Sequence, residues 1–191
     1  MRRRDRFRQI FVYAIYILIT GIVQFQWPDS WGAWGVKPDF MLVLVVLAGY
    51  LYGFVDGAVV GLVSGFVRDC LGSRVFGSGM LMLFLAGVLA ASLFQRNMNR
   101  TAITVLLSII TITLLLDVAI FVIQYSMVRS ADMRMWAFSV QAYAGKRLLP
   151  LELFNLLSGL LMLPIFKNFG PYPKRVQRDR LTQGVRGEEL L

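Results

Sequence analysis

The stretch Gly57-Ala-Val-Val-Gly61-Leu-Val-Ser-Gly65-Phe-Val-Arg-Asp69 repeats glycine at every fourth position and ends the series with a carboxylate. Residues four apart lie on one face of a helix, so the glycines form a ridge that Asp69 continues. A glycine ridge lets two helix backbones approach closely, as helices packed inside a membrane often do. The stretch therefore predicts a helix whose glycine face packs against another helix, with Asp69 in the same seam.

Apolar segments continue on both sides of this helix. Hydrophobic residues make up 57% of the 191 residues and charged residues 16%, whereas soluble domains are roughly 45–50% apolar and about 25% charged. Because a helix needs about 20 apolar residues to cross a bilayer, we expect a single domain over residues 1–166 with membrane-spanning segments. The expected spans are residues 9–26, 39–54, 55–71, 79–94, 102–128 and 149–166. The predicted fold class is an all-α, polytopic membrane helical bundle of about six transmembrane helices.

Basic residues gather at the two ends of the chain. The net charge is +9, with five Arg in the first eight residues and six Lys or Arg in residues 167–191. Basic segments beside apolar ones follow the positive-inside rule, so both termini are predicted to be cytoplasmic. The basic tail 167–191 is expected to be flexible and to be attracted to anionic lipid headgroups. Since no soluble face combines basic residues with interleaved aromatic residues, we expect no binding of nucleic acid.

Two segments are expected at the outer membrane surface. Trp27, Trp31 and Trp34 lie between the first two spans, and Trp favours the membrane–water boundary, so they are predicted interface anchors. Residues 133–147 are too polar to span the bilayer, but their apolar residues recur at loose helical spacing. These residues allow two interpretations, an interfacial helix or an ordinary loop.

Composition excludes much of the usual catalytic chemistry. The chain has no His and a single Cys, Cys70. An intramolecular disulfide, a His-ligated metal and a haem or iron–sulfur site are therefore not expected. Ser64 lacks the base that a nucleophilic serine needs. We expect no enzyme, no cofactor and no metal site, and we interpret Cys70 as a packing residue.

Acidic residues inside or at the ends of spans are candidates for function, because charge in a bilayer is costly. The candidates are Asp39, Asp56, Asp69, Asp117 and Glu152. Asp39 follows Lys37-Pro38 and suits a helix cap, while Asp117 is expected to face the bundle interior. Asp69 is either a contact for a ligand or partner, or a polar cross-link between spans. Arg68 beside it offers a local ion pair.

Several short motifs occur in a characteristic order along the chain. They are Trp27-Pro28-Asp29, Lys37-Pro38-Asp39, the stretch from Gly61 to Asp69, Leu116-Asp117-Val118, and Leu149-Pro150 followed by Asn155 and Pro164. In this order and spacing they resemble MreD, a family of bacterial rod-shape-determining membrane proteins. Arg68 departs from the family pattern, which often has a small or aliphatic residue there.

The resemblance implies a non-enzymatic subunit of the bacterial inner membrane that binds an MreC-like scaffold. It also implies indirect links to the actin-like MreB, to the glycosyltransferase RodA and to RodA's partner transpeptidase. In that setting the subunit would help to regulate or organise sidewall peptidoglycan synthesis. The resemblance further implies a fold similar to the S components of ECF vitamin transporters, which by itself says little about function.

Two hypotheses for the function follow. In the first, a transmembrane helix of the scaffold packs on small residues of the third or fourth span. These residues are Gly57, Gly61 and Gly65, beside Asp69, and Ala86 and Ala90. The alternative is an S-component-like transporter subunit that binds a small molecule in a polar pocket. That pocket would be formed by Asp39, Asp69, Asp117 and the tryptophans.

Overall fold

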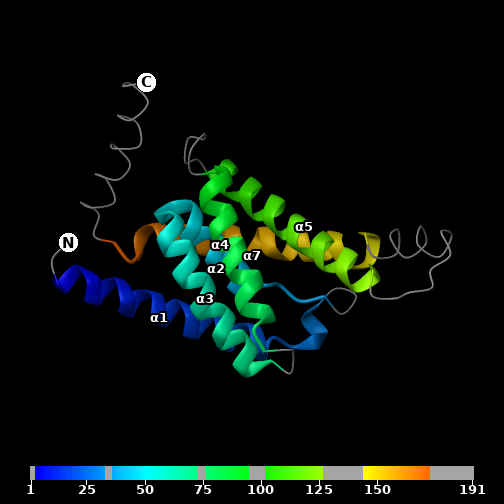
Figure 1. The fold of residues 1–191 in the computed structure, drawn as a ribbon, viewed down its shortest axis with the longest axis horizontal. Coiled ribbons are helices and arrows are strands. Elements are labelled where there is room, and N and C mark those ends of the chain that lie inside the picture. The colour runs from blue at the N-terminus through cyan, green and yellow to red at the C-terminus, as the bar shows by residue number, and fades with distance from the viewer. Residues whose placement is uncertain (1–2, 33–35, 73–75, 95–101, 127–143, 173–191) are drawn as a thin grey trace, which may run out of the picture.

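A computed structural model of the chain describes residues 3–32, 36–72, 76–94, 102–126 and 144–172. In these residues the chain forms six α-helices and no strand (Figure 1), which confirms the predicted all-α class. The helices are α1 (Arg3–Gln26), α2 (Phe40–Tyr52), α3 (Phe54–Leu71), α4 (Ser78–Phe94), α5 (Ala102–Ser126) and α7 (Leu149–Asn168). A 3-10 turn, η1 (Asp29–Trp31), precedes α2, and a π-helical turn, η2 (Ala144–Leu148), precedes α7.

Three of the described helices are long and apolar enough to cross a membrane, over residues 5–26, 103–120 and 145–168. Helices α2 and α4 are apolar but shorter, with 13 and 17 residues. Helix α1 begins before the expected residue 9, because the Arg-rich segment continues as helix with Asp5 in its first turn. Most of the stretch 133–147 lies outside the described residues, and its last residues belong to η2.

Helix α2 lies at the centre of the bundle and contacts each of the other described α-helices. Every residue from Met41 to Tyr52 is buried. A helix that is apolar on all sides is stable when other elements surround it. Figure 1 shows how this happens: α1 runs along one edge, α3 and α4 lie side by side, and α5 runs alongside α7. The outer faces of these helices carry large exposed apolar side chains, as a membrane-embedded surface does.

Glycines bring the backbones of α2 and α3 against the backbone of α4. At each of four glycines, an added Cβ would collide with main-chain atoms of α4. The colliding pairs are Gly49 with Gly87, Gly57 with Gly87, Gly61 with Leu83, and Gly65 with Met80. The ridge therefore packs within the chain. Its glycine face is covered by α4 and is not open to a helix of another protein.

The glycine series crosses the break between α2 and α3 at Gly53. This residue has a φ of 107°, a left-handed conformation that residues with a side chain rarely adopt. The N–H of Gly53 donates to the carbonyl of Gly49 at 3.0 Å, and the N–H of Gly57 donates to the carbonyl of Gly53 at 2.9 Å. The chain thus turns sharply while its backbone hydrogen bonds continue, and Gly49 and Gly57 face the same residue of α4.

The beginning of the expected tail packs against the bundle. Helix α7 continues through Lys167 to Asn168, and Tyr172 beyond it is 4% exposed. The Tyr172 hydroxyl donates to the Asp56 carboxylate at 2.6 Å, and the Gln9 side-chain amide donates to the same carboxylate at 2.7 Å. The expected start of the flexible tail at residue 167 is therefore too early. The contact of Tyr172 with the Asp56 carboxylate keeps the chain packed on the bundle as far as residue 172. Residues 173–191 lie outside the described part.

The close contact between α3 and α4 predicts a steep cost for a single methyl group. Gly61→Ala should lower the stability of the detergent-solubilised protein by about 1–3 kcal/mol, the usual cost of overpacking. Helix propensity alone would favour Ala by about 1 kcal/mol. Gly145→Ala is the matched control, because an added Cβ there meets no atom within 4 Å. An unfolding midpoint for Gly61→Ala equal to that of Gly145→Ala would contradict the packing described here.

Candidate functional site

Asp39 is the centre of a polar network at the end of the bundle opposite the start of α1. Its Oδ1 accepts from the backbone N–H of Leu42 at 3.0 Å and caps α2. Its Oδ2 pairs with the guanidinium of Arg68 at the end of α3, at 2.8 Å. Its own N–H donates to the side-chain oxygen of Asn155 on α7 at 2.8 Å. One aspartate therefore joins α2, α3 and α7.

This network identifies the partner of Arg68. Their adjacency allows a local ion pair with Asp69, but the Arg68 guanidinium pairs with Asp39 instead. Adjacent residues on a helix point about 100° apart, so Arg68 faces α2 while Asp69 faces the loop before α4. The two side chains of the Arg68–Asp39 pair are 16% and 15% exposed. An ion pair that is shielded from water is stable only when further hydrogen bonds compensate for the lost hydration. Asp39 has such bonds to Leu42 and Asn155.

Asp117 forms a second ion pair near the first. It lies in α5, is 6% exposed, and approaches Arg147 of η2, with 3.8 Å between Oδ1 and Nη2. One turn earlier on α5, the Thr113 hydroxyl accepts from the Asn155 amide at 3.4 Å. Asp117 thus faces the bundle interior, and Asn155 connects its helix to the Asp39 network.

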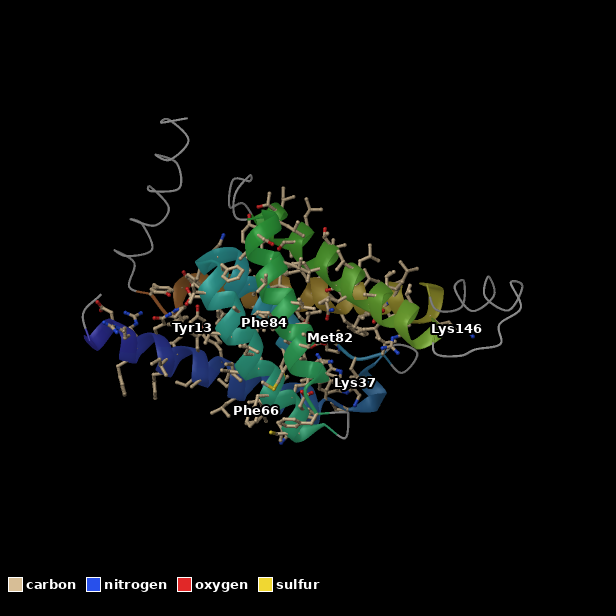
Figure 2. All side chains as sticks on the ribbon, viewed as in Figure 1. Tyr13, Lys37, Phe66, Met82, Phe84 and Lys146 are labelled. Carbon is tan, nitrogen blue, oxygen red and sulfur yellow. The ribbon has the colours of Figure 1, made fainter. Side chains whose placement is uncertain are left out.

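A pocket of about 600 Å³ opens between these two ion pairs. It is lined by the ends of α1 and α3, the starts of α2, α4 and α7, the middle of α5, and η2. The charged lining residues are Lys37, Asp39, Arg68, Asp117, Lys146 and Arg147. Figure 2 shows Lys37 and Lys146 toward this end of the bundle and Tyr13 toward the other. Four basic residues against two acidic ones make the lining net positive.

Asp69 does not line this pocket. Its Oδ2 accepts from the N–H groups of Gly77 and Met80, at 2.8 and 3.2 Å, and its Oδ1 accepts from Gly79 at 2.9 Å. The carboxylate therefore accepts hydrogen bonds from the first N–H groups of α4. A negative charge at this position also interacts favourably with the helix dipole. Gly77 has a φ of 95°, which bends the loop toward Asp69. Of the two interpretations of Asp69, the geometry matches the polar cross-link.

The remaining predicted residues lie apart from the pocket or at its edge. Ala86 and Ala90 are fully buried within the chain's own core. Trp27 packs on Trp31 and Phe40, with ring centroids 5.5 and 5.2 Å apart, and its carbonyl accepts from Lys37 at 3.1 Å. Trp34 lies outside the described residues.

Glu152 in the first turn of α7 is a buried carboxylate of a different kind. Within the described residues, neither of its oxygens has a hydrogen-bond partner, although both are shielded from solvent. Glu152 does not belong to the pocket lining.

Several residues of the site were not singled out as candidates from the sequence. The sequence places Thr113 on the helix face of Asp117 and Asn155 in a family-like motif, but it predicts neither their contacts nor a role for Arg147. Asn155 was recognisable, since a carboxamide inside an apolar helix must find partners. Arg147 carried no such signal, because it lies in a polar stretch where a basic residue is ordinary. Among the described residues, no cluster of three or more His, Cys, Asp or Glu could hold a metal ion.

The helices and their charged end define an integral membrane protein of the helical-bundle class. The family model described as rod shape-determining protein MreD matches residues 5–170. The chain therefore belongs to the MreD family. No curated protein and no solved structure matches it, so the expected likeness to S components stays a prediction.

The cap on α4 leads to a test of the role of Asp69. Asp69→Ala should destabilise the protein by about 2–4 kcal/mol, because it removes a cap with charge-assisted hydrogen bonds to buried N–H groups. Cys70→Ala is the neighbouring control, because Cys70 is exposed. Thermal unfolding in mild detergent measures both variants. Equal midpoints for the two would show that Asp69 does not hold the α3–α4 connection.

Proposed function

We propose that this chain is a non-enzymatic subunit of the rod-shape machinery that binds an MreC-like scaffold in the inner membrane. The family match over residues 5–170 carries the proposal. The helical bundle supports it, since apolar helices offer membrane-embedded surfaces for a partner's helix. In this proposal both termini are cytoplasmic, and links to MreB, RodA and its transpeptidase are indirect, through the scaffold. The subunit then helps to organise sidewall peptidoglycan synthesis.

The partner's helix requires a surface other than the glycine ridge. Bulky residues at Gly61 or Gly65 would separate α3 from α4, so they would disrupt the fold before they tested a partner. Helix α7 offers an alternative in a row of exposed leucines, one per turn. The row is Leu149, Leu153, Leu157 and Leu161, each more than half exposed. Rows at four-residue spacing form the ridges that fit grooves between side chains of a neighbouring helix.

The first test is a pull-down of the tagged full chain from its native membrane in mild detergent, with proteins identified by mass spectrometry. Wild type should recover an MreC-like scaffold, and Leu157→Ala/Leu161→Ala should reduce recovery about tenfold or more, the result of losing roughly 1.4 kcal/mol or more of packing. Leu18→Ala/Ile22→Ala on α1 is the matched control, since both residues are also exposed. Full recovery with the α7 variant would reject the leucine row, and no scaffold with wild type would reject the proposal.

The polar pocket favours a second candidate, an S-component-like subunit that binds a small molecule. It joins Asp39 and Asp117 near Trp27, as that hypothesis requires, but Asp69 is occupied elsewhere. The same pull-down separates the two candidates. Recovery of ATPase subunits with a membrane coupling protein, in place of the scaffold, would favour the transporter subunit.

A further inference from the structure

The pocket between Asp39 and Asp117 has features that packing of a partner's helix does not explain. It holds about 600 Å³, near the middle of the range of ligand sites, roughly 300–1,000 Å³. Charged side chains are costly in or near a bilayer, and those found there tend to serve a ligand or a path. Six charged side chains line this one pocket.

The net positive charge of the lining indicates that the pocket binds an anion. Asp39 and Asp117 each have an arginine as ion-pair partner, Arg68 at 2.8 Å and Arg147 at 3.8 Å. Two further cations, Lys37 and Lys146, line the same pocket, so its basic residues outnumber its acidic ones. Lysine and arginine side chains that lie close together bind phosphate oxygens through charge-assisted hydrogen bonds.

Apart from Gln24, Thr113 and Gly72, the uncharged part of the lining is apolar, which distinguishes an amphiphile from a free anion. Apolar side chains come from five different helices. They include Phe25 of α1, Leu42 of α2, Met82 of α4, and Leu116 and Ile120 of α5. A small hydrated anion gains nothing from such a wall, whereas the glycerol and first methylenes of a lipid bury apolar area against it.

The position of the pocket matches the depth of lipid headgroups. Trp27 packs beside it, and its carbonyl accepts from the pocket residue Lys37. Tryptophan marks the level where acyl chains meet headgroups. Lys146 and Arg147 belong to η2, just before α7 enters its apolar stretch, so they stand at the same boundary. The Arg147 side chain is 49% exposed, so a ligand can reach it from the opening of the pocket.

We propose that this pocket binds the phosphate-bearing headgroup of an anionic lipid. Lys37 and Lys146 contact the phosphate from the two sides of the pocket. Arg68 and Arg147 are paired with Asp39 and Asp117, so the two lysines supply the net positive charge of the pocket. The apolar wall accepts the upper part of the acyl chains. The proposal is independent of scaffold binding, because it uses neither the leucine row nor a partner protein.

The experiment uses the purified full chain in dodecyl maltoside and follows its unfolding midpoint as ligand is added. The probes are dioleoyl phosphatidic acid, dioleoylglycerol with the same chains but no phosphate, and inorganic phosphate. A ligand that binds only the folded state raises the midpoint in proportion to its occupancy. Phosphatidic acid should raise it at low mole fraction, and the other two probes should not.

Lys37→Gln/Lys146→Gln should raise the half-saturating fraction of phosphatidic acid about 25-fold, since each basic residue near an anionic headgroup contributes roughly fivefold. Lys167→Gln is the matched control, because it removes the same charge at the other end of α7. Ile120→Trp is a second variant that fills the apolar wall. It should weaken binding and provides the decisive result if the double variant does not fold.

Four results would overturn the proposal. An unchanged response of the double variant, or of Ile120→Trp, would place the lipid elsewhere. An equal loss in Lys167→Gln would show general attraction to a basic protein. A midpoint increase with dioleoylglycerol equal to that with phosphatidic acid would show that phosphate is not recognised. An equal increase with inorganic phosphate would replace the lipid with a free anion.

Discussion

The backbones of α2 and α3 lie directly against the backbone of α4, and the packing of the other described helices follows from this contact. It is possible because Gly49, Gly57, Gly61 and Gly65 present no side chain to α4. In a bilayer, apolar burial gives little drive for helices to associate, so van der Waals contact between backbones has to supply it. With α4 this close, the short helix α2 is enclosed on that side, and α1, α5 and α7 complete its enclosure.

The same approach determines where the polar groups meet. Because α3 ends beside the loop before α4, Asp69 receives the first N–H groups of that helix. Arg68, one residue earlier, then points toward the start of α2 and pairs with Asp39. Asn155 extends the contact to α7 and α5. Charges that would each be costly in a membrane thus compensate one another at one end of the bundle. Their arrangement leaves a net-positive pocket there.

Membership of the MreD family identifies the chain as a rod-shape-determining membrane protein. The structure has an internal glycine seam and, apart from it, accessible surfaces on which a partner or ligand can bind. The glycine seam is internal and maintains the fold, whereas the outer apolar faces and the charged end are accessible. Partner recognition and ligand recognition can therefore occupy different surfaces, and a change at one need not reach the other.

From the sequence alone follow the all-α class, the approximate positions of the six α-helices in the described residues, and the face on which the glycines lie. These follow from local rules, because hydrophobic length and four-residue spacing depend only on neighbours along the chain. The sequence also indicated that Asp39 caps a helix. Only the tertiary structure decided which helix covers the glycine ridge, that Arg68 pairs with Asp39 and not with Asp69, and that Lys37 and Arg147 line one pocket. Such pairings join residues far apart in the chain, and no periodicity within one helix specifies the helix that it will meet.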